Sequence, residues 1–263
     1  MHRWIPLLLA VLWCAPDARA ALVAAQSGFN DATGISSDAT PDSPFTLGQT
    51  VAGRGVGEPG WAGGWGISRG GGAGGAEAGT AQSFAAYEGD GGLFLEGRPN
   101  AGEMWANRFL ATPFTGKVFI SQNVQLKSLG LLQSRPGNGG VGTLVGAHWQ
   151  FHADGHVFAG DGQLNGNVVF EDTGFTYAPN TWYKVSTIID VPSQTYRFFL
   201  NDVEYLAPDP LNFRGDIHSI DFVDYLAQTD VYVDNVSVVP EPTAALAGSA
   251  LSLLLLRRRR VAG

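Results

Sequence analysis

The chain has 263 residues, with 24 acidic against 16 basic residues and a formal net charge of −8. An acidic surface repels nucleic acid and anionic lipid, so no nucleic-acid partner is expected. The length suits one globular domain with a short segment at each end, and the 44% of hydrophobic residues are enough to build its core.

The first 20 residues have the organisation of a cleavable signal peptide. His2 and Arg3 precede an apolar run at 5–13, and Ala18-Arg19-Ala20 follows as an A-x-A cleavage site. The protein is therefore expected to be exported, with residues 1–20 removed. This removes the only cysteine, Cys14, so the mature domain has no disulfide and depends on its core.

Residues 21–239 alternate between apolar and polar side chains, which is typical of strands with one buried face. In Lys117–Leu126, for example, Val118, Ile120 and Val124 share one parity. A tight turn is predicted at Asn201-Asp202, because both residues tolerate left-handed backbone. Strands are predicted at 22–31, 84–87, 93–96, 103–110, 117–126, 144–151, 156–159, 168–171, 182–191, 195–200, 203–206, 217–223 and 231–239. About a dozen short strands favour an all-β antiparallel sandwich.

Residues 48–79 are crowded with glycine and carry Trp61 and Trp65. A glycine tract loses much conformational entropy on folding and packs few side chains. We therefore expect a long loop over one face or edge of the sandwich, held in place by the two tryptophans. No linker is long enough to indicate a second domain.

Two segments resemble the concanavalin A/laminin-G-like jelly roll. Asn180-Thr181-Trp182-Tyr183 leads to Asp190 and then to a hairpin whose turn in that family is usually Asn-Gly; here it is Asn201-Asp202. The closing run Tyr232–Val238 resembles the last strand of such domains. The resemblance implies a jelly-roll β-sandwich whose last strand pairs with its first.

Two kinds of ligand site follow as hypotheses. If the first and last strands pair, Asn30, Asp31, Asp234 and Asn235 meet, and their oxygens suit a structural Ca²⁺ of the kind that many such domains hold. The alternative is hydrogen bonding at the strand ends. For carbohydrate, flat rings stack on pyranose faces, and the candidate platforms, each of which alternatively belongs to the core, are Trp61, Trp65, Trp105 and Trp149.

His148, His152 and His156 invite a comparison with zinc sites. If Asp154-Gly155 is a two-residue hairpin turn, His152 faces Val157. His156 then lies on the opposite face from His148 and His152, with Trp149 and Phe151. The three imidazoles do not converge in this register, so no zinc site is expected. The core there is predicted to contain Trp149, Phe151 and Phe158.

The last 24 residues, 240–263, form a sorting segment. Pro240-Glu241-Pro242 is followed by an apolar run at 243–256 and then by Arg257, Arg258, Arg259 and Arg260. As a helix the run spans ~20 Å, against ~30 Å for a hydrocarbon core. The segment resembles the PEP-CTERM signal of Gram-negative surface proteins. That resemblance implies an exosortase partner, transient anchoring in the inner membrane and final placement at the cell surface or outside. An ordinary short tail anchor is the alternative.

Some members of the concanavalin-like family that the chain resembles are retaining glycosidases, and these carry a Glu-x-Asp-x-x-Glu strand, whose alternation places two carboxylates on one face. The nearest string, Glu88-Gly89-Asp90-Gly91-Gly92-Leu93, lacks the second glutamate. A non-catalytic surface protein is therefore expected, one that binds carbohydrate, sits in the extracellular polysaccharide matrix, or both. Two alternatives stay open: a purely structural surface protein, and a polysaccharide-degrading hydrolase or lyase whose carboxylates meet only in the folded chain.

Overall fold

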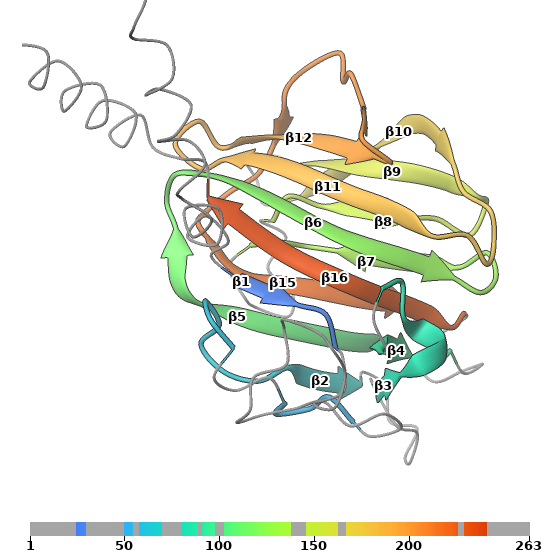
Figure 1. The fold of residues 1–263 in the computed structure, drawn as a ribbon. Coiled ribbons are helices and arrows are strands. Elements are labelled where there is room, and N and C mark those ends of the chain that lie inside the picture. Colours follow the sequence, from blue (N-terminus) through green and yellow to red (C-terminus); the bar gives the residue numbers. More distant parts are fainter. Residues whose placement is uncertain are drawn as a thin grey trace, which may run out of the picture.

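The computed structural model describes residues 25–29, 50–54, 58–69, 80–88, 91–97, 103–137, 146–162, 167–225 and 229–240. Within these ranges the chain is all-β apart from one short 3-10 helix, and its strands form two antiparallel sheets (Figure 1). The described part contains no helix with the length and apolarity needed to cross a membrane. Residues 1–20, Asn30, Asp31 and the tail beyond Pro240 lie outside the described residues.

The nine-stranded sheet runs across the front of Figure 1. Two further strands join its main path at the side: β1 (Ala25–Ser27) pairs with β16, and β14 (Leu211–Asn212) pairs with β12. Its main path among the described residues is β13 (Val203–Glu204), β12 (Thr195–Leu200), β11 (Tyr183–Asp190), β6 (Lys117–Leu126), β16 (Val231–Pro240), β4 (Gly92–Leu95) and β3 (Thr80–Gln82).

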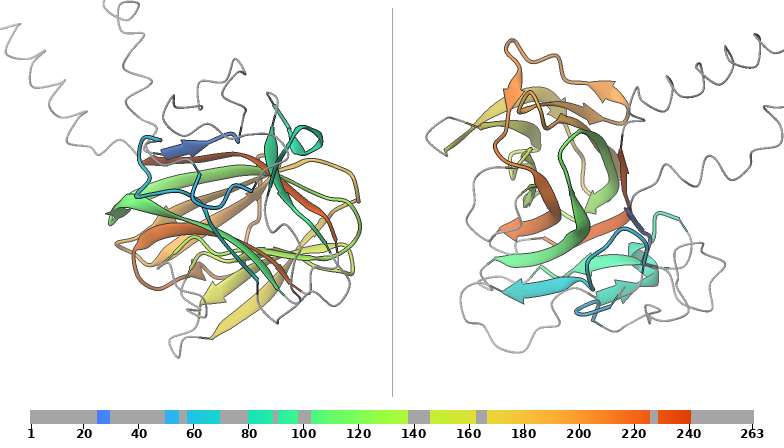
Figure 2. Two further views of the ribbon diagram at one scale, coloured as in Figure 1. Left: turned by 90° about the horizontal axis from the view of Figure 1, so that it is seen from below. Right: turned by 90° about the vertical axis from the view of Figure 1, so that its left-hand side faces the viewer.

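The seven-stranded sheet lies behind the first, and Figure 2 shows the two layers from the side. Its order among the described residues is β10 (Val168–Thr176), β9 (His156–Gly162), β8 (Trp149–Phe151), β7 (Leu131–Ser134), β15 (Ile217–Tyr225), β5 (Met104–Phe114) and β2 (Gly66–Arg69). The inward side chains of both sheets form one core that includes Phe151, Phe198 and Phe222, all fully buried. Each such side chain contributes ~1.5–3 kcal/mol by leaving water.

Several sequence predictions are confirmed. Strands β6 and β12 have the predicted bounds, and Asn201 and Asp202 form the turn with φ of 49° and 64°. Strand β1 pairs with β16, as the resemblance implied. The strand predicted at 84–87 is wrong, because the chain turns there into the 3-10 helix η1 (Ser83–Ala85). The strands β2, β3, β7 and β14 were not predicted.

The glycine-rich segment is more than a loop, since its Gly66–Arg69 part pairs with β5 as an edge strand. Trp61 and Trp65 are buried beside the guanidinium of Arg108, whose Cζ lies 4.6 Å from the Trp61 ring centroid. Arg108 forms a buried ion pair with Glu58, and its Nε donates to the Gly63 carbonyl at 2.9 Å. Burial lowers the pKa of Arg108, an effect that Glu58 opposes. This ion pair and the tryptophans together attach the segment to the sandwich.

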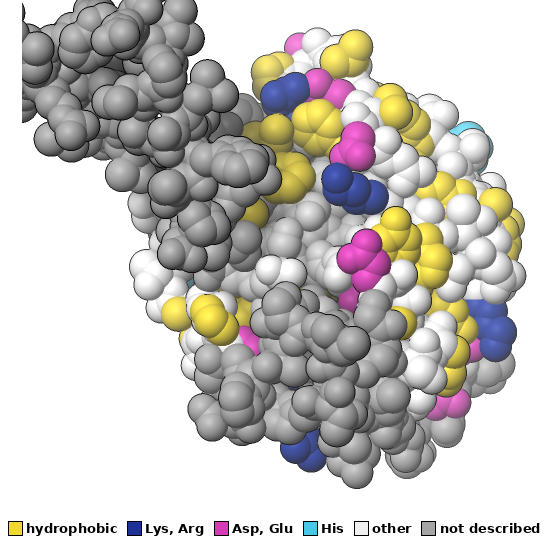
Figure 3. Space-filling view, in the orientation of Figure 1, with side chains coloured by type: hydrophobic (Ala, Val, Ile, Leu, Met, Phe, Trp, Pro, Cys, Tyr) yellow, Lys and Arg dark blue, Asp and Glu magenta, His cyan; other side chains and the backbone are white. Residues whose placement is uncertain are grey.

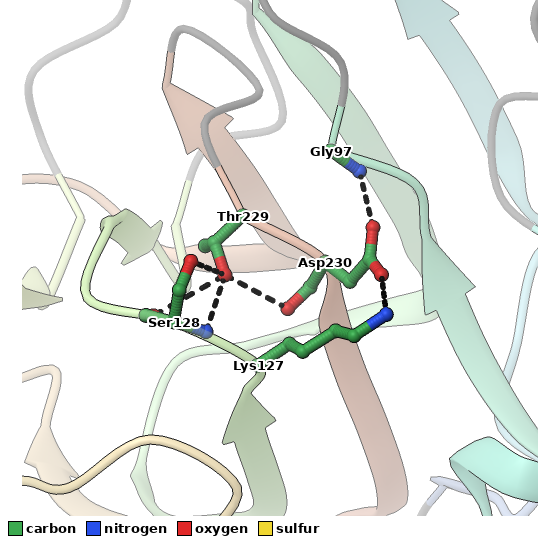
Figure 4. A network of polar contacts seen from close by, with 5 residues as sticks. All are labelled: Gly97, Lys127, Ser128, Thr229 and Asp230. Carbon is green, nitrogen blue, oxygen red and sulfur yellow. Dashed lines mark hydrogen bonds and ion pairs between the residues drawn. The ribbon is translucent and has the colours of Figure 1, made fainter.

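The crossover from β6 to β7 carries the chain from one sheet to the other, and a polar network fixes it (Figure 4). Asp230, just before β16, pairs with Lys127 Nζ at 3.0 Å and accepts a hydrogen bond from Gly97 N at 3.0 Å. Thr229 Oγ1 accepts from Ser128 N at 2.9 Å. These contacts join the end of β6, the segment after β4 and the start of β16. They thereby set where β7 begins.

Candidate ligand-binding face

Three of the four candidate tryptophan platforms lie in the interior. Trp61, Trp65 and Trp149 are buried members of the core cluster, so their rings contact core side chains and present no accessible face to a sugar. Trp105 is different. It is also mostly buried, but its parity on β5 places it on the outer face of the seven-stranded sheet, away from the core cluster.

Strand register brings polar side chains together on that outer face. Gln133 lies opposite Gln150, and Val223 lies opposite both Gln133 and Trp105. One pleat further along, Asp221 lies opposite Asn107, and Arg135 N donates to Asp221 O at 3.1 Å. Since Ser134 pairs with Trp149, His148 is the neighbour of Arg135 on the next strand. We call this set the polar band; its members are Trp105, Asn107, Gln133, Arg135, His148, Gln150 and Asp221.

Arg135 lies at the centre of the polar band. Its Cζ lies 4.2 Å from the Trp105 ring centroid, within the range of a cation–π contact, and Trp105 Nε1 donates to Glu103 Oε2 at 3.1 Å. Arg135 is only 5% exposed, yet among the described residues no carboxylate lies within ion-pairing distance and its Nη2 has no hydrogen-bond partner. A buried guanidinium without such partners is costly in free energy, so it calls for an explanation.

His148 is the second unusual member of the polar band. It is 1% exposed, and neither ring nitrogen has a hydrogen-bond partner in the described structure. Burial, with a smaller effect of the Arg135 charge, lowers the pKa of His148 to about 3, so the imidazole is neutral at physiological pH. Its backbone is fixed from the opposite sheet, because the buried Tyr196 hydroxyl lies 2.7 Å from both the His148 and Gly160 carbonyl oxygens. A Cβ at Gly160 would approach His148 Cβ to 2.7 Å, so glycine permits this packing.

The remaining members supply a carboxylate and amides. Burial raises the pKa of Asp221 to about 6, against the opposing influence of Arg135 and of Ser219, whose Oγ lies 3.4 Å from Asp221 Oδ2. Gln133 Nε2 donates to Gln150 Oε1 at 2.7 Å. Gln133 and Asn107 remain half-buried, so the polar band is accessible at positions on both sides of Arg135.

The three histidines do not follow the predicted register. Phe151 pairs with Val157, and His152 N donates to the His156 carbonyl oxygen, so the loop has three residues rather than two. Gly155, with a φ of 88°, allows this wider loop. His156 therefore lies on the same outer face as His148 and His152, and Phe158 is outside the core, against the prediction.

The imidazoles of His152 and His156 each lie beside a different carboxylate. His152 Nδ1 lies 3.0 Å from Asp154 Oδ1, and His156 Nδ1 lies 2.9 Å from Asp172 Oδ2. No group of three or more metal-ligating side chains occurs among the described residues. The register from which the absence of a zinc site was predicted is therefore wrong, since the three imidazoles share one face of the sheet.

Half of the predicted calcium set is described. Asp234 is fully buried, and its Oδ2 accepts hydrogen bonds from Tyr87 N at 2.8 Å and Glu88 N at 3.0 Å. Its Oδ1 accepts from Asn235 N at 2.7 Å. Both oxygens therefore accept hydrogen bonds from backbone N–H groups, and Asp234 anchors the turn after η1. Asn30 and Asp31 lie outside the described residues.

A second surface lies on the outer face of the nine-stranded sheet, the face seen in Figure 3. Rings there contact one another edge to face, with centroids 5.1 Å apart for Phe84 and Phe94 and 5.5 Å apart for Tyr87 and Trp182. Phe84 is 58% exposed. We call this set the aromatic strip; its members are Phe84, Tyr87, Phe94, Trp182 and Tyr232. The described side chains of this face include hydrophobic, basic and acidic ones (Figure 3).

Of the polar band, sequence reasoning proposed Trp105 as a sugar platform and considered His148 only as a zinc ligand. A signal was present, because Gln133 and Arg135 occupy alternate positions around the small buried Ser134, and His148 and Gln150 occupy alternate positions around the buried Trp149. The pairing of β7 with β8 and β15 was missing, since β7 was not predicted as a strand.

No protein-family model matches the sequence, and no curated protein matches it either. Among solved structures, the chain is similar to a sialidase at 12% identity and a TM-score of 0.50, covering 69% of this chain and 17% of the sialidase. It is also similar to the carbohydrate binding module CBM66 from Bacillus subtilis, at 11% identity and a TM-score of 0.43, covering 74% of this chain and 99% of the module. At such identities the likeness to the sialidase, of which this chain spans 17%, concerns the β-sandwich fold alone.

Proposed function

We propose that this protein is an exported, non-catalytic carbohydrate-binding protein that uses the polar band as its binding face. The observation that carries the proposal is the buried guanidinium of Arg135, which lies on the Trp105 ring without an ion-pair partner among the described residues. A buried polar group without partners calls for an explanation, and a ligand that completes its hydrogen bonds supplies one. The proposal includes a jelly-roll sandwich of the concanavalin A type.

The composition of the polar band suits a sugar. Hydroxyl groups both donate and accept, and so do the amides of Asn107, Gln133 and Gln150. The indole of Trp105 and the half-buried rings of Phe158 and Phe170 on the neighbouring strands supply apolar surface. A few convergent polar groups set among aromatic rings are typical of small-molecule sites.

Export is the second part of the proposal, and it rests on the sequence alone. The signal at residues 1–20 directs the chain outwards, and the segment from Pro240 to Arg260 directs it to an exosortase in the inner membrane. The mature domain then acts at the cell surface or in the extracellular polysaccharide. Replacing Arg257–Arg260 by glutamine should leave the protein in the membrane fraction; release of this variant at the wild-type rate would contradict the sorting role.

Binding is tested by titrating the purified protein with a panel of oligosaccharides in a calorimeter. Trp105→Ala should weaken binding at least tenfold, whereas Trp182→Ala, which removes an indole from the aromatic strip instead, should bind as the wild type does. Loss of binding only in Trp182→Ala would place the site on the aromatic strip. Absence of binding at millimolar ligand would leave a structural surface protein.

One observation favours a catalytic alternative. Asp221 has a pKa raised to about 6, and the neutral His148 lies beside Arg135 in the same band. Groups with shifted pKa values gather at active sites. Incubation of the same oligosaccharides with the protein, followed by chromatography of the products, tests this alternative. The proposal predicts intact oligosaccharides, and turnover that is abolished by Asp221→Asn would replace it with a hydrolase or lyase.

A further inference from the structure

We infer that the ligand of the polar band is an acidic saccharide whose carboxylate binds the guanidinium of Arg135. This inference rests on the proposed function and names the substrate class of the same site. It depends on what surrounds Arg135, which donor atoms remain available, and how the site differs from that of Arg108, the other buried arginine among the described residues.

The buried arginines Arg108 and Arg135 provide an internal comparison. Both stack on tryptophan rings, at 4.6 Å from Trp61 and 4.2 Å from Trp105. Arg108 also has the carboxylate of Glu58 and the carbonyl of Gly63 as partners. For Arg135 the described residues supply no ion pair and no side-chain hydrogen bond, although it is only 5% exposed. Glu58 provides a carboxylate for Arg108, and no described residue provides one for Arg135.

The charged and titratable groups around Arg135 do not replace that partner. Asp221 on β15 is the nearest carboxylate by register, but it makes no ion pair with Arg135, and burial disfavours its charged form. His148 on the β8 side is neutral. Glu103, at the start of β5, accepts the Trp105 indole N–H. On β7, which ends at Ser134 just before Arg135, the nearest outward side chain is the uncharged Gln133.

The stacking on Trp105 determines which kind of anion fits. A ring against one face of the guanidinium leaves the N–H donors in the guanidinium plane, where a planar carboxylate binds through two parallel hydrogen bonds. Gln133 and Asn107, half-buried on either side, can bind the hydroxyls of the same sugar. The formal net charge of the chain is −8, so the surface does not attract anions in general and recognition of the carboxylate depends on the guanidinium of Arg135.

The experiment compares matched ligands on the purified protein. Trigalacturonate, its methyl ester and a sulfated galactan tetrasaccharide are titrated against the wild type by calorimetry. Charge-assisted hydrogen bonds predict that the acid binds roughly 10- to 100-fold more tightly than the ester. Arg135→Met keeps the apolar stem and should reduce the ratio of the affinities for the acid and the ester to about one. Arg135→Lys keeps the positive charge but lacks the planar pair of guanidinium N–H donors, so it should retain only part of the preference for the acid.

Each outcome has a defined meaning. Equal affinity of the acid and the ester for the wild type would overturn the inference but leave carbohydrate binding intact. Binding of none of the three ligands would overturn the inference and, with a broader panel, the proposed function as well. Tighter binding of the sulfated ligand than of the acid would overturn the assignment to a carboxylate. The preference of the wild type needs no variant, so misfolding of Arg135→Met would not affect that comparison.

Discussion

Neutralising Glu58 should destabilise the protein far more than the same change at an exposed glutamate. Glu58 forms its ion pair with Arg108 in the core, with both side chains almost completely buried. Glu58→Gln removes the Glu58 carboxylate from the buried Arg108 charge, and breaking a buried ion pair in this way costs about 3–5 kcal/mol. For a domain of this size each kcal/mol shifts Tm by about 2–4 °C, so the expected loss is roughly 6–20 °C.

The matched control is Glu204→Gln. Glu204 pairs with Arg197 on the surface, with Arg197 Nε 2.5 Å from Glu204 Oε1, so the chemistry is the same but solvent screens the charges. Its loss should cost under about 1 kcal/mol. Differential scanning calorimetry of both variants measures the contrast. The double variant Glu58→Leu, Arg108→Met should recover most of the lost stability, because apolar pairs replace buried ion pairs well. Equal Tm values for Glu58→Gln and Glu204→Gln would refute the reasoning.

Three further predictions concern the titrating groups and the strand ends. The pKa of Asp221 is about 6 in the folded protein, against an ordinary value of 3.8, so its ionisation costs the folded state about 3 kcal/mol above pH 6 and nothing below pH 4. The Tm of the wild type should therefore rise as pH falls from 6 to 4. Asp221→Asn should abolish this rise. The pKa of His148 is about 3 in the folded protein, against an ordinary value of 6.5, so the unfolded chain binds a proton first and stability falls as pH drops below 6.5. His148→Gln should remove that loss of stability. For either variant, a Tm that follows the wild-type Tm between pH 4 and 7 would contradict the pKa assigned to the residue replaced. Asp234→Asn should cost about 1–3 kcal/mol by disturbing the hydrogen bonds from Tyr87 and Glu88, while EDTA leaves the wild-type Tm unchanged; a fall in Tm with EDTA would indicate Ca²⁺ instead.

The sequence predicts those strands best whose two faces differ most. In β12, apolar residues such as Phe198 enter the core at every second position, and β6 shows the same alternation, interrupted only by the buried Gln122. This alternation defines the strand. The strands β3 and β14 are too short to show a period. Strand β2 lies in a glycine-rich tract whose composition resembles a loop, and its pairing depends on contacts with β5.

The polar band illustrates a different limit. Its members come from four segments between Trp105 and Asp221, and only the order of strands in the sheet makes them neighbours. The histidine hairpin shows how sensitive such reasoning is, because one additional loop residue moved His156 to the opposite face. Local patterns indicate which side chains point outwards. The tertiary pairing decides which of them meet.

The most direct test of the account is a two-dimensional NMR titration that follows the indole N–H signals of the tryptophans. The signals of Trp105 and Trp182 are assigned by their loss in Trp105→Phe and Trp182→Phe. Adding trigalacturonate should shift the Trp105 signal saturably and leave the Trp182 signal in place. A Trp105 signal that does not move while ligand binds, or a saturable shift of Trp182 alone, would contradict a binding site on the outer face of the seven-stranded sheet.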